Sequence, residues 1–391
     1  MDKCDVAIIG GGVMGSAIAY FLAADAGFKG SIAVIEKDPT YETAATPRSA
    51  GGIRQQFSTP ENIRMGAFGA QFVKSIGEHL SVDGEVAQLP FVEWGYLFLA
   101  TAAGMDVLGR NHVQQAALGA SVALLPAPEL KERFPWVNVE DLAGGCYGTA
   151  NEGWTDPYSL LQAFRRKARA LGVTYLADEV VDLKRAGAVI TSVTLRNAGS
   201  LACGTVVNAA GYHAHEVAAK IGIDLPIRPR KRIVYVFECR APLHGAPLLI
   251  DPNGVWFRPE HGSYIGGVSP PEAEDPDCLD FEVDDRLFEE VVWPTLAHRV
   301  PAFEAIKLAR SWAGHYDYNT LDQNAILGPH PEVANFYFAN GFSGHGLQQS
   351  PAVGRAIGEL IAFGEYRSID LRRFSYDRVT ENRPIVELNV V

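Results

Sequence analysis

A glycine-rich turn near the N-terminus constrains the fold more than any other feature of this 391-residue chain. Residues 4–9 form a short, β-branched apolar run, and Gly10-Gly11-Gly12-Val13-Met14-Gly15 follows directly, matching G-x-G-x-x-G. Apolar residues at helical spacing come next, then a second apolar run, 31–35, which ends at Glu36, 21 residues after Gly15. A strand, a glycine turn, a helix, a second strand and an acid at these distances predict a Rossmann-like dinucleotide-binding unit.

The glycines and the acid of this unit each have a physical role in binding a dinucleotide. Gly10 makes the tight turn, Gly12 lets backbone N–H groups approach a pyrophosphate, and Gly15 lets the helix pack against the strand. The helix N-terminus supplies partial positive charge. Glu36 accepts the ribose hydroxyls and repels a 2′-phosphate, which disfavours NADP. The pattern alone leaves NAD and FAD equally open, because both carry the same ADP half.

Composition argues against several other classes of function. The formal net charge is -12, and nucleic-acid binding needs a net basic surface. The five cysteines show no metal-ligand spacing, so the sequence predicts neither a disulfide framework nor a metal site. No apolar run approaches the roughly 20 residues of a membrane span, and we expect a cytoplasmic protein. The basic stretch 228–232 is either a solvated strand edge or a contact for an anionic group.

The later strands of the Rossmann sheet do not follow in one block. Residues 81–145 carry a bulky β-rich stretch and a polar helix, and residues 225–320 are β-rich again. Helix and strand alternate between them, beginning with a helix that Asp156 caps ahead of Pro157. We therefore expect an α/β chain, α+β overall, whose Rossmann-like nucleotide-binding domain is interleaved with a mainly antiparallel β substrate-binding domain. The predicted domains are 1–80, 146–224 and 322–391 for the nucleotide, and 81–145 and 225–321 for the substrate.

Several spaced motifs resemble those of the D-amino-acid oxidase superfamily of FAD-dependent oxidoreductases. The likeness runs nearly end to end and is greatest to the sarcosine oxidase and dehydrogenase branch and to FAD-dependent oxidoreductase-domain proteins. The motifs are Ile8–Gly15, Ser49–Ser58, Asn208–Gly211, Trp312–Gly314 with Asp322 and Ile326–Gly328, and Gly341–Gly346. The resemblance implies FAD rather than NAD, and oxidation of a C–N bond next to a carboxylate, with hydride passing to flavin N5.

The resemblance also assigns FAD contacts along the whole chain. It implies non-covalent FAD, because the cysteine that attaches flavin in some relatives is missing from 312–316; a histidyl link through His315 is the alternative. The implied contacts to the ADP half are Gly10, Gly12, Val13, Met14, Gly15, Glu36 and Lys37, with Val180 at the adenine. Those beside the pyrophosphate and flavin are Arg48, Ser49, Ala50, Gly51, Gly52, Ala209, Ala210, Gly211, Gly341, Gly344, His345, Gly346, Leu347 and Gln348.

The glycine-rich stretch Asn340–Gly346 precedes a predicted helix over 352–363. Ser350 is expected to be its N-cap and Pro351 its first residue. The helix start and the N–H groups of Gly346, Leu347 and Gln348 can then face negative charge that develops on a flavin. We interpret the stretch as a backbone cradle rather than a surface turn.

The candidate substrate residues differ from those of the sarcosine-oxidising relatives. Such relatives carry a lysine for the substrate carboxylate at the position of Gln348, and oxygen-reactive ones carry a lysine in the strand where this chain has Tyr264. These differences favour a dehydrogenase or a slow oxidase. Arg54 is the best remaining carboxylate partner, because a guanidinium offers a planar fork of donors; the alternative is an arginine that braces the flavin loop. Tyr264 and Trp256 are candidate pocket walls, and a core role for Trp256 is equally open.

The sequence thus predicts an FAD-dependent oxidoreductase acting on an amine or amino acid, with a secondary or N-substituted amino acid favoured. The catalytic candidates are Arg54, His345, Gln348 and Tyr264, and a structural or flavin-contacting role is favoured for His345. Two alternatives stay open: a 2-hydroxy-acid dehydrogenase that uses His345 or His315 as base, and an FAD-binding assembly factor without turnover. The electron acceptor, whether oxygen, a quinone or an electron carrier, is not fixed by the sequence.

Overall fold

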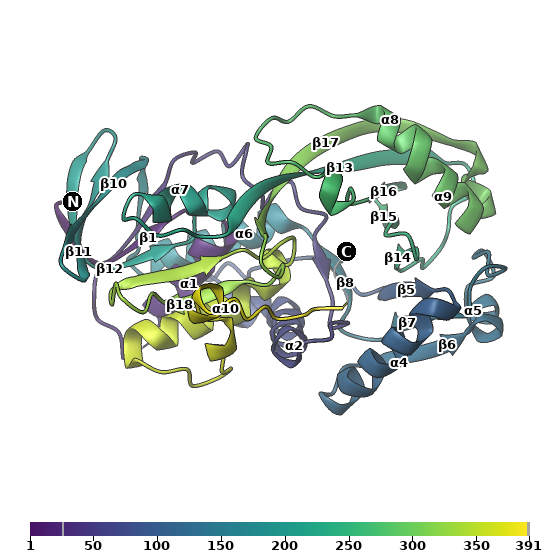
Figure 1. Cartoon of the computed structure of the whole chain (residues 1–391), viewed down its shortest axis with the longest axis horizontal. Helices are drawn as coiled ribbons and strands as arrows, with labels where there is room; N and C mark the ends of the chain where they lie inside the picture. Colours follow the sequence, from purple (N-terminus) through teal and green to yellow (C-terminus); the bar gives the residue numbers. More distant parts are fainter. Residues whose placement is uncertain (26, 389–391) are drawn as a thin grey trace.

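Two eight-stranded sheets and one small sheet organise the chain, with helices packed against them. The computed structural model describes residues 1–25 and 27–388. Figure 1 shows the first large sheet at the left, and the second at the right, with the long strands β13 and β17 arching from the middle of the molecule toward the upper right. This arrangement places the N-terminal glycine turn beside the second sheet.

The first sheet is the Rossmann-like one, and its central pairings are parallel. β1 lies between β2 and β12, with Ile8 opposite Val34 on one side and Val207 on the other. All three side chains are fully buried, as expected for parallel strands covered on both faces. Its strands are β1 (Lys3–Ile9), β2 (Ile32–Glu36), β9 (Thr174–Ala177), β10 (Val180–Ala186), β11 (Val189–Leu195), β12 (Gly199–Asn208), β18 (Ile326–Pro329) and β19 (Phe336–Asn340).

Four helices pack against one another over one face of this sheet: α1 (Val13–Ala24), α2 (Pro60–Lys74), α6 (Pro157–Ala170) and α10 (Gly346–Phe363). The predicted cap of α6 is confirmed, because the Asp156 carboxylate accepts a hydrogen bond from the N–H of Ser159 at 2.6 Å. The short helix α7 (Ala214–Ala219) buries Ala214 and Val217 against the other face. Short helices α3 (Ile76–Leu80) and α11 (Asp377–Thr380) complete this half.

The second sheet is antiparallel except where β5 pairs with β14, which confirms a mainly antiparallel second layer. Its two long strands, β13 and β17, pair from Ile227 opposite Asn319 to Cys239 opposite Ile306. The strand order is β17 (Ile306–Asn319), β13 (Ile227–Cys239), β16 (Ser263–Gly267), β15 (Trp256–Glu260), β14 (Leu248–Ile250), β5 (Tyr96–Ala100), β7 (Gly144–Gly148) and β6 (Val122–Pro126). The helices of this half are α4 (Ala102–Ala117), α5 (Ala127–Arg133), α8 (Asp285–Leu287) and α9 (Trp293–Arg299).

A small three-stranded sheet contains the short strand at the end of the predicted flavin loop. Its order is β3 (Gly52–Ile53), β8 (Gly153–Thr155) and β4 (Phe91–Val92). Gly51 before β3 has a positive φ of 79°, and a Cβ atom there would lie 2.2 Å from the carbonyl oxygen of Thr155. The predicted flavin loop therefore enters this sheet through a turn that requires glycine.

Helix α10 begins earlier than the sequence suggested. It starts at Gly346 with His345 as N-cap, so Pro351 lies inside the helix and Ser350 is not a cap. Pro351 has no N–H to donate to the carbonyl of Leu347, four residues before it. The Ser350 hydroxyl donates to that same carbonyl oxygen at 2.8 Å. Ser350 and Pro351 therefore act as a pair inside the helix, which is why their cap-like sequence misled the prediction.

The sheets relate to the predicted domains in a simple way. All strands of the first sheet lie in the ranges proposed for nucleotide binding, whereas β7, Gly144–Gly148, belongs to the second sheet and is cut by the proposed boundary at residue 146. The division into two domains therefore stays a proposal, with that boundary moved beyond β7. Within residues 1–25 and 27–388, none of the helices combines the length and apolar character needed to span a bilayer.

Candidate active site

One long cavity runs from the N-terminal glycine turn to the second sheet. At one end it is lined by Gly10 and Glu36 of the Rossmann-like unit, and at the other by Tyr96 of β5 and Trp256 of β15. Arg54 lines it between the sheets. Segments far apart in the sequence thus contribute to one binding site.

The glycines of the N-terminal turn are required by the backbone around them. Gly10 has a φ of 98°, and a Cβ atom there would lie 2.4 Å from the carbonyl oxygen of Ala209. A Cβ atom at Gly15 would lie 1.9 Å from the carbonyl oxygen of Gly10. Because both distances are far below van der Waals contact, β1, α1 and the end of β12 can meet only where these residues lack side chains.

Glu36 ends β2 and turns its carboxylate toward this turn. Oε2 accepts a hydrogen bond from the N–H of Gly11 at 2.7 Å, and Oε1 accepts one from the N–H of Asp38 at 2.8 Å. Burial raises the pKa of Glu36 above its usual range, against the opposite effect of these two hydrogen bonds. The side chain lines the cavity at the carboxyl end of the second strand, where an acid accepts ribose hydroxyls.

Arg48 lines the middle of the cavity and is fixed by one bond within its own loop and one to a distant strand. Its Nε donates to the carbonyl of Glu42 at 2.8 Å, and its Nη1 donates to the carbonyl of Ala313 at 2.7 Å. The indole N–H of Trp312 donates in turn to the carbonyl of Arg48 at 3.0 Å. These contacts join the loop after β2 to β17 and hold a cationic side chain on the cavity wall.

The C-terminal glycine-rich stretch connects β19 to α10 along the same cavity. Gly341 and Gly344 have φ values of 78° and 95°. A Cβ atom at Gly344 would lie 2.5 to 2.7 Å from atoms of the Tyr316 side chain. The N–H groups of Gly346–Gln348, in the first turn of α10, have no acceptor within the helix, and all three residues line the cavity. The stretch therefore presents backbone donors to whatever the cavity binds.

Asp317 of β17 supports this turn from behind. Its Oδ2 accepts hydrogen bonds from the N–H groups of Gly341 at 2.8 Å and Phe342 at 3.2 Å. Burial raises the pKa of Asp317 to about 6, and these hydrogen bonds act in the opposite direction. The carboxylate thus holds the backbone that leads into α10.

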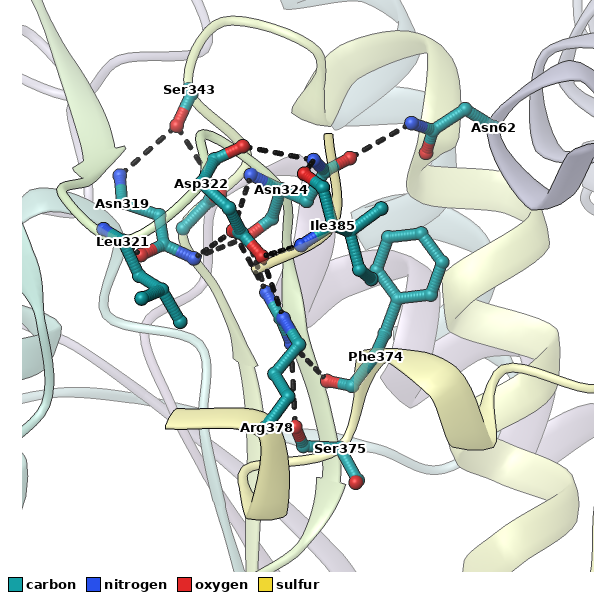
Figure 2. A network of polar contacts seen from close by, with 11 residues as sticks. Asn62, Asn319, Leu321, Asp322, Asn324, Ser343, Phe374, Ser375, Arg378 and Ile385 are labelled. Atoms are coloured by element: carbon teal, nitrogen blue, oxygen red, sulfur yellow. Dashed lines mark hydrogen bonds and ion pairs between the residues drawn. The ribbon is translucent and has the colours of Figure 1, made fainter. Parts of the chain in front are cut away.

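A buried polar network joins the neighbouring loop to the C-terminal segment (Figure 2). The Nε of Arg378 lies 2.9 Å from Oδ2 of Asp322, and both side chains are at most 2% exposed. The same Oδ2 accepts from the N–H of Ile385 at 2.9 Å, while Asn324 donates to the Ile385 carbonyl and accepts from Asn62. Separating such a buried pair would leave an uncompensated charge, which is costly. The pair therefore keeps Asp322, and the loop before β18 that carries it, in one position.

Arg54 lies between two aromatic rings and is only 3% exposed. Its guanidinium carbon is 4.1 Å from the ring centroid of Phe57 and 5.1 Å from that of Phe98. Nη1 donates to the carbonyl of Gln56 at 2.6 Å. The backbone N–H of Arg54 donates to Oε1 of Gln348 at 2.7 Å, which ties its loop to the first turn of α10. The cation is therefore held in one orientation at the cavity wall.

His345 faces this guanidinium. Its Nε2 lies 3.0 Å from Nη2 of Arg54. Because arginine offers only donors, Nε2 must accept, and we assign the ring proton to Nδ1. Burial, with a smaller contribution from the positive charge of Arg54, lowers the pKa of His345 to about 3. The ring is therefore neutral near pH 7, a weak proton acceptor whose Nε2 already has a partner.

Comparison with known proteins identifies the family that this geometry belongs to. A family model described as FAD dependent oxidoreductase matches residues 5–360. The chain belongs to this family. FAD is its cofactor and it is an oxidoreductase, as the sequence resemblance predicted.

Individual relatives agree with the family over nearly the whole chain. FAD-dependent oxidoreductase domain-containing protein 1 of Xenopus laevis is 47% identical over 425 residues, covering 100% of this chain and 85% of the relative. Glycine oxidase of Geobacillus kaustophilus is 29% identical, covering 96% of this chain and 97% of the relative. The crystal structure of L-proline dehydrogenase from P. horikoshii superposes with a TM-score of 0.87 at 27% identity, covering 98% of this chain and 100% of that one. The likeness to these proteins therefore extends over nearly the whole of this chain.

The cavity has the features that FAD requires. The glycine contacts at Gly10 and Gly15 allow backbone to approach a pyrophosphate, and Glu36 is placed for the adenosine ribose. Arg48 and the first turn of α10 offer positive potential farther along the cavity. Bound there, FAD would supply a two-electron acceptor, and these residues would hold and orient it.

Most of the residues assigned to FAD from the sequence line this cavity. Gly15, Gly51 and Gly341 shape the backbone behind it and do not line it. The assigned residues on the cavity wall are Gly10, Gly12, Val13, Met14, Glu36, Lys37, Arg48, Ser49, Ala50, Gly52, Val180, Ala209, Ala210, Gly211, Gly344, His345, Gly346, Leu347 and Gln348.

Of the two predicted pocket walls, the structure places only Trp256 on the cavity. Tyr264 lies in the core on the other face of the second sheet, stacked on Phe237 with ring centroids 5.5 Å apart. Its hydroxyl accepts from the N–H of Leu243 at 2.6 Å. The next residue, Ile265, packs in the cluster that contains Trp256. Side chains alternate faces along a strand, so Tyr264 points to the opposite face from Ile265 and does not line the cavity as expected.

Glu152 is a buried residue behind the site, not on the cavity wall, that the sequence reasoning missed. It is 1% exposed, and its Oε1 accepts from the N–H groups of Gln55 at 2.6 Å and Gln56 at 3.1 Å. Its Oε2 accepts from Nε2 of Gln56 at 2.8 Å. Burial raises the pKa of Glu152 to about 7, with the hydrogen bonds from Gln56 and Gln55 opposing that rise. In the sequence it stands between Asn151 and Gly153, which resembles an exposed turn, so no local signal marks it.

Proposed function

We propose that the protein oxidises the C–N bond of an amino acid, with its FAD as the hydride acceptor. The observation that carries this proposal is Arg54, a buried guanidinium on the wall of the FAD cavity. A planar fork of donors suits a carboxylate. Glycine oxidase and L-proline dehydrogenase, which resemble this chain, are named for amino acids.

The residues have separate roles in this step. Arg54 binds the substrate carboxylate and so fixes which carbon approaches the cofactor. The substrate loses a hydride from its α-carbon and a proton from its nitrogen, which leaves a C=N bond. Water then hydrolyses that bond to an oxo acid and an amine or ammonia. Arg48 and the donors of Gly346–Gln348 stabilise the negative charge that the cofactor gains.

A secondary or N-substituted amino acid is the substrate that we favour. The nitrogen must give up its proton before the C–N bond can be oxidised, and a cation beside Arg54 in a dry cavity is disfavoured. The charge of Arg54 therefore promotes the neutral amine, and no protein base is required. L-proline dehydrogenase, by its name, acts on a secondary amine.

Oxidation of a 2-hydroxy acid is less well supported by these contacts. That reaction requires a base for the hydroxyl proton. His345 has a pKa lowered to about 3 and its Nε2 faces Arg54, and the pKa of His315 is also lowered by burial. The electron acceptor, oxygen, a quinone or an electron carrier, and a cytoplasmic location stay predictions.

An anaerobic screen tests the proposal. The holoprotein is mixed with secondary, cyclic and D- and L-amino acids, with opines and with 2-hydroxy acids, and loss of the yellow flavin colour is recorded. Bleaching by an amino acid with formation of an oxo acid supports the proposal. Bleaching by hydroxy acids alone shows that the protein oxidises a C–O bond instead. No bleaching by any of these compounds favours an FAD-binding role without turnover.

A further inference from the structure

Apolar side chains cover the face of the second sheet that borders the cavity. Leu248 and Ile250 of β14 point to this face, and Leu249 between them points into the opposite core. Tyr96 of β5 lies directly beside Leu248 in the parallel pairing. We call the set that borders the cavity the apolar wall: Tyr96, Leu248, Ile250, Trp256 and Val268.

Arg54 stands at one end of the apolar wall. Its guanidinium carbon is 5.1 Å from the ring of Phe98, and Phe98 is the β5 residue that pairs with Ile250 of the wall. Phe98 and Tyr96 are two residues apart and share one face of β5, with their rings 6.3 Å apart. When Arg54 binds the substrate carboxylate, the rest of the substrate therefore lies along the apolar wall.

Charged groups that line the cavity are not placed to pair with a second charge on the substrate. The acids Glu36, Asp38, Asp178, Glu179 and Glu216 and the cations Lys37 and Lys220 line it near the Rossmann-like unit. Arg48 also lines it and donates to the carbonyls of Glu42 and Ala313, and Arg232 lines it and pairs with Asp275 at 2.7 Å. Asp317 also lines it, and its Oδ2 already accepts two backbone hydrogen bonds. Burying an unpaired charge against the apolar wall is costly, whereas burying methylene groups there is favourable.

We infer that the substrate is an amino acid whose side chain or N-substituent is apolar, an inference that rests on the proposed function and narrows it. The carboxylate binds Arg54 and the apolar part lies on the wall. Each added methylene group that reaches the wall tightens binding by about fourfold. Acidic, basic and small polar amino acids bind more weakly.

The test separates binding from turnover. The holoprotein is titrated with acetate, propionate, butyrate and benzoate, and with succinate as the charged comparison, while the visible spectrum of bound FAD reports the Kd. We expect the Kd to fall with each methylene group and to rise for succinate. Ile250→Asn should abolish the chain-length trend, and Val189→Asn, on an exposed part of β11, should leave it unchanged.

The outcomes distinguish this inference from the proposed function. If polar or charged amino acids bleach the flavin as well as apolar ones do, and the Kd ignores chain length, the apolar inference is wrong and amino-acid oxidation stands. If the Kd follows chain length and no amino acid bleaches the flavin, the wall binds apolar carboxylates and the proposed function fails. The trend in the unmodified protein decides the matter even if the Ile250→Asn variant does not fold.

A second observation concerns the basic stretch of β13 that the sequence singled out. Instead of a solvated edge or an external anion, it meets an acidic loop of the same chain. The Cys278 N–H donates to the Pro229 carbonyl at 3.0 Å, which lays the loop along the strand. The ion pairs are Arg232–Asp275 at 2.7 Å, Arg230–Asp277 at 3.0 Å and Lys231–Asp280 at 2.7 Å.

The residue after these acids, Phe281, packs on two residues of the cavity wall. The Arg48 guanidinium carbon lies 4.3 Å from the Phe281 ring centroid, and the His315 ring meets Phe281 edge-on at 4.6 Å. Both Arg48 and His315 line the FAD cavity. The acidic loop thus ends on the outer side of the groups that border the cofactor.

We propose that residues 275–281 are a cover for the FAD cavity, held shut by these ion pairs, and that opening it limits FAD exchange. Pairs of this kind weaken as salt rises, because the screening length falls from about 10 Å at 0.1 M to about 3 Å at 1 M. The proposal needs no substrate and is independent of the reaction.

FAD release from the holoprotein, followed by the rise in flavin fluorescence after dilution, tests the cover. We expect release to be faster at 1 M than at 0.1 M salt. The double variant Asp277→Asn/Asp280→Asn, which keeps the Arg232–Asp275 pair, should release FAD about tenfold faster at low salt and show a weaker salt dependence. The control Asp182→Asn/Asp370→Asn removes two exposed acids paired elsewhere. Equal release rates and salt dependence in the two double variants would overturn the proposal.

Discussion

The Nη2 atom of Arg54 and the Nε2 atom of His345 lie 3.0 Å apart inside the FAD cavity. This contact joins the loop after β3 to the cap of α10, and so couples the group proposed to bind the substrate to the turn that presents backbone donors. Because Arg54 donates and His345 accepts, the histidine keeps the arginine oriented and is not left free as a base.

Replacing Arg54 by methionine should weaken substrate binding strongly. The loss of one partner of a buried charged contact costs on the order of 2–4 kcal/mol, or about 30- to 1,000-fold in KM. Steady-state kinetics with the substrate from the anaerobic screen measures it. Arg64→Met, at an exposed position of α2, is the matched control. An unchanged KM in the Arg54 variant would remove it from carboxylate binding.

His345 should make the protein less stable in acid. Its pKa is lowered to about 3 in the folded state, so between about pH 6.5 and 3 the unfolded chain binds a proton that the folded chain does not. Stability is therefore lost as pH falls through this range, by about 2 kcal/mol at pH 5. Urea unfolding of His345→Gln, whose amide oxygen can still accept from Arg54, should show less of this loss. His261→Gln, at an exposed turn, should behave like the unmodified protein.

Glu152 should change the stability with pH in the direction opposite to His345. Burial raises its folded pKa to about 7 from its ordinary value of 4.5, so the folded chain holds a proton that the unfolded chain releases between these values. The stability it contributes is present below about pH 4.5 and is lost as pH rises to about 7, a change of about 3 kcal/mol. Glu152→Gln should flatten this part of the profile, measured by urea unfolding from pH 4.5 to 8. If the exposed control Glu140→Gln flattens it equally, Glu152 is not responsible.

A side chain at Gly344 should damage the FAD site. Its φ is 95°, and a Cβ atom would lie 2.5 Å from the Tyr316 ring, so Gly344→Ala should cost about 2 kcal/mol or more and weaken FAD binding. Gly84→Ala is the control, because Gly84 has a φ of 82° with no heavy atom within 4 Å of the added Cβ. FAD titration and thermal unfolding measure how much more FAD affinity and stability Gly344→Ala loses than Gly84→Ala does. This difference is the effect of the clash alone. Equal losses would show that backbone strain is the whole effect.

Unfolding the chain with acid should release FAD into solution, because no covalent bond attaches it. The sequence around Trp312–Tyr316 has no cysteine for a flavin link, and His315 is held beside Phe281 and Tyr212. Precipitation with acid followed by absorbance of the supernatant tests this. Yellow colour retained in the pellet would demonstrate a covalent attachment, with His315→Ala as the variant that locates it.

Local sequence determined the nucleotide half of this protein. The spacing of Gly10, Gly15 and Glu36 predicts a strand, a turn, a helix and a second strand, and the structure has them there. The cap at Asp156 is also local and is confirmed. The family followed from several such motifs in order, and FAD followed from the family.

The substrate half was decided by tertiary structure. Tyr264 and Ile265 differ only in which face of β16 they occupy, and that register depends on pairing with β13 and β15. Glu152 supports the loop beside Arg54 only because Gln55 and Gln56, about a hundred residues away in sequence, are brought to it. The start of α10 depends on Ser350 replacing the bond that Pro351 cannot make. Short-range patterns encode turns and strands, whereas burial, pKa and pairing arise only when distant segments exclude water together.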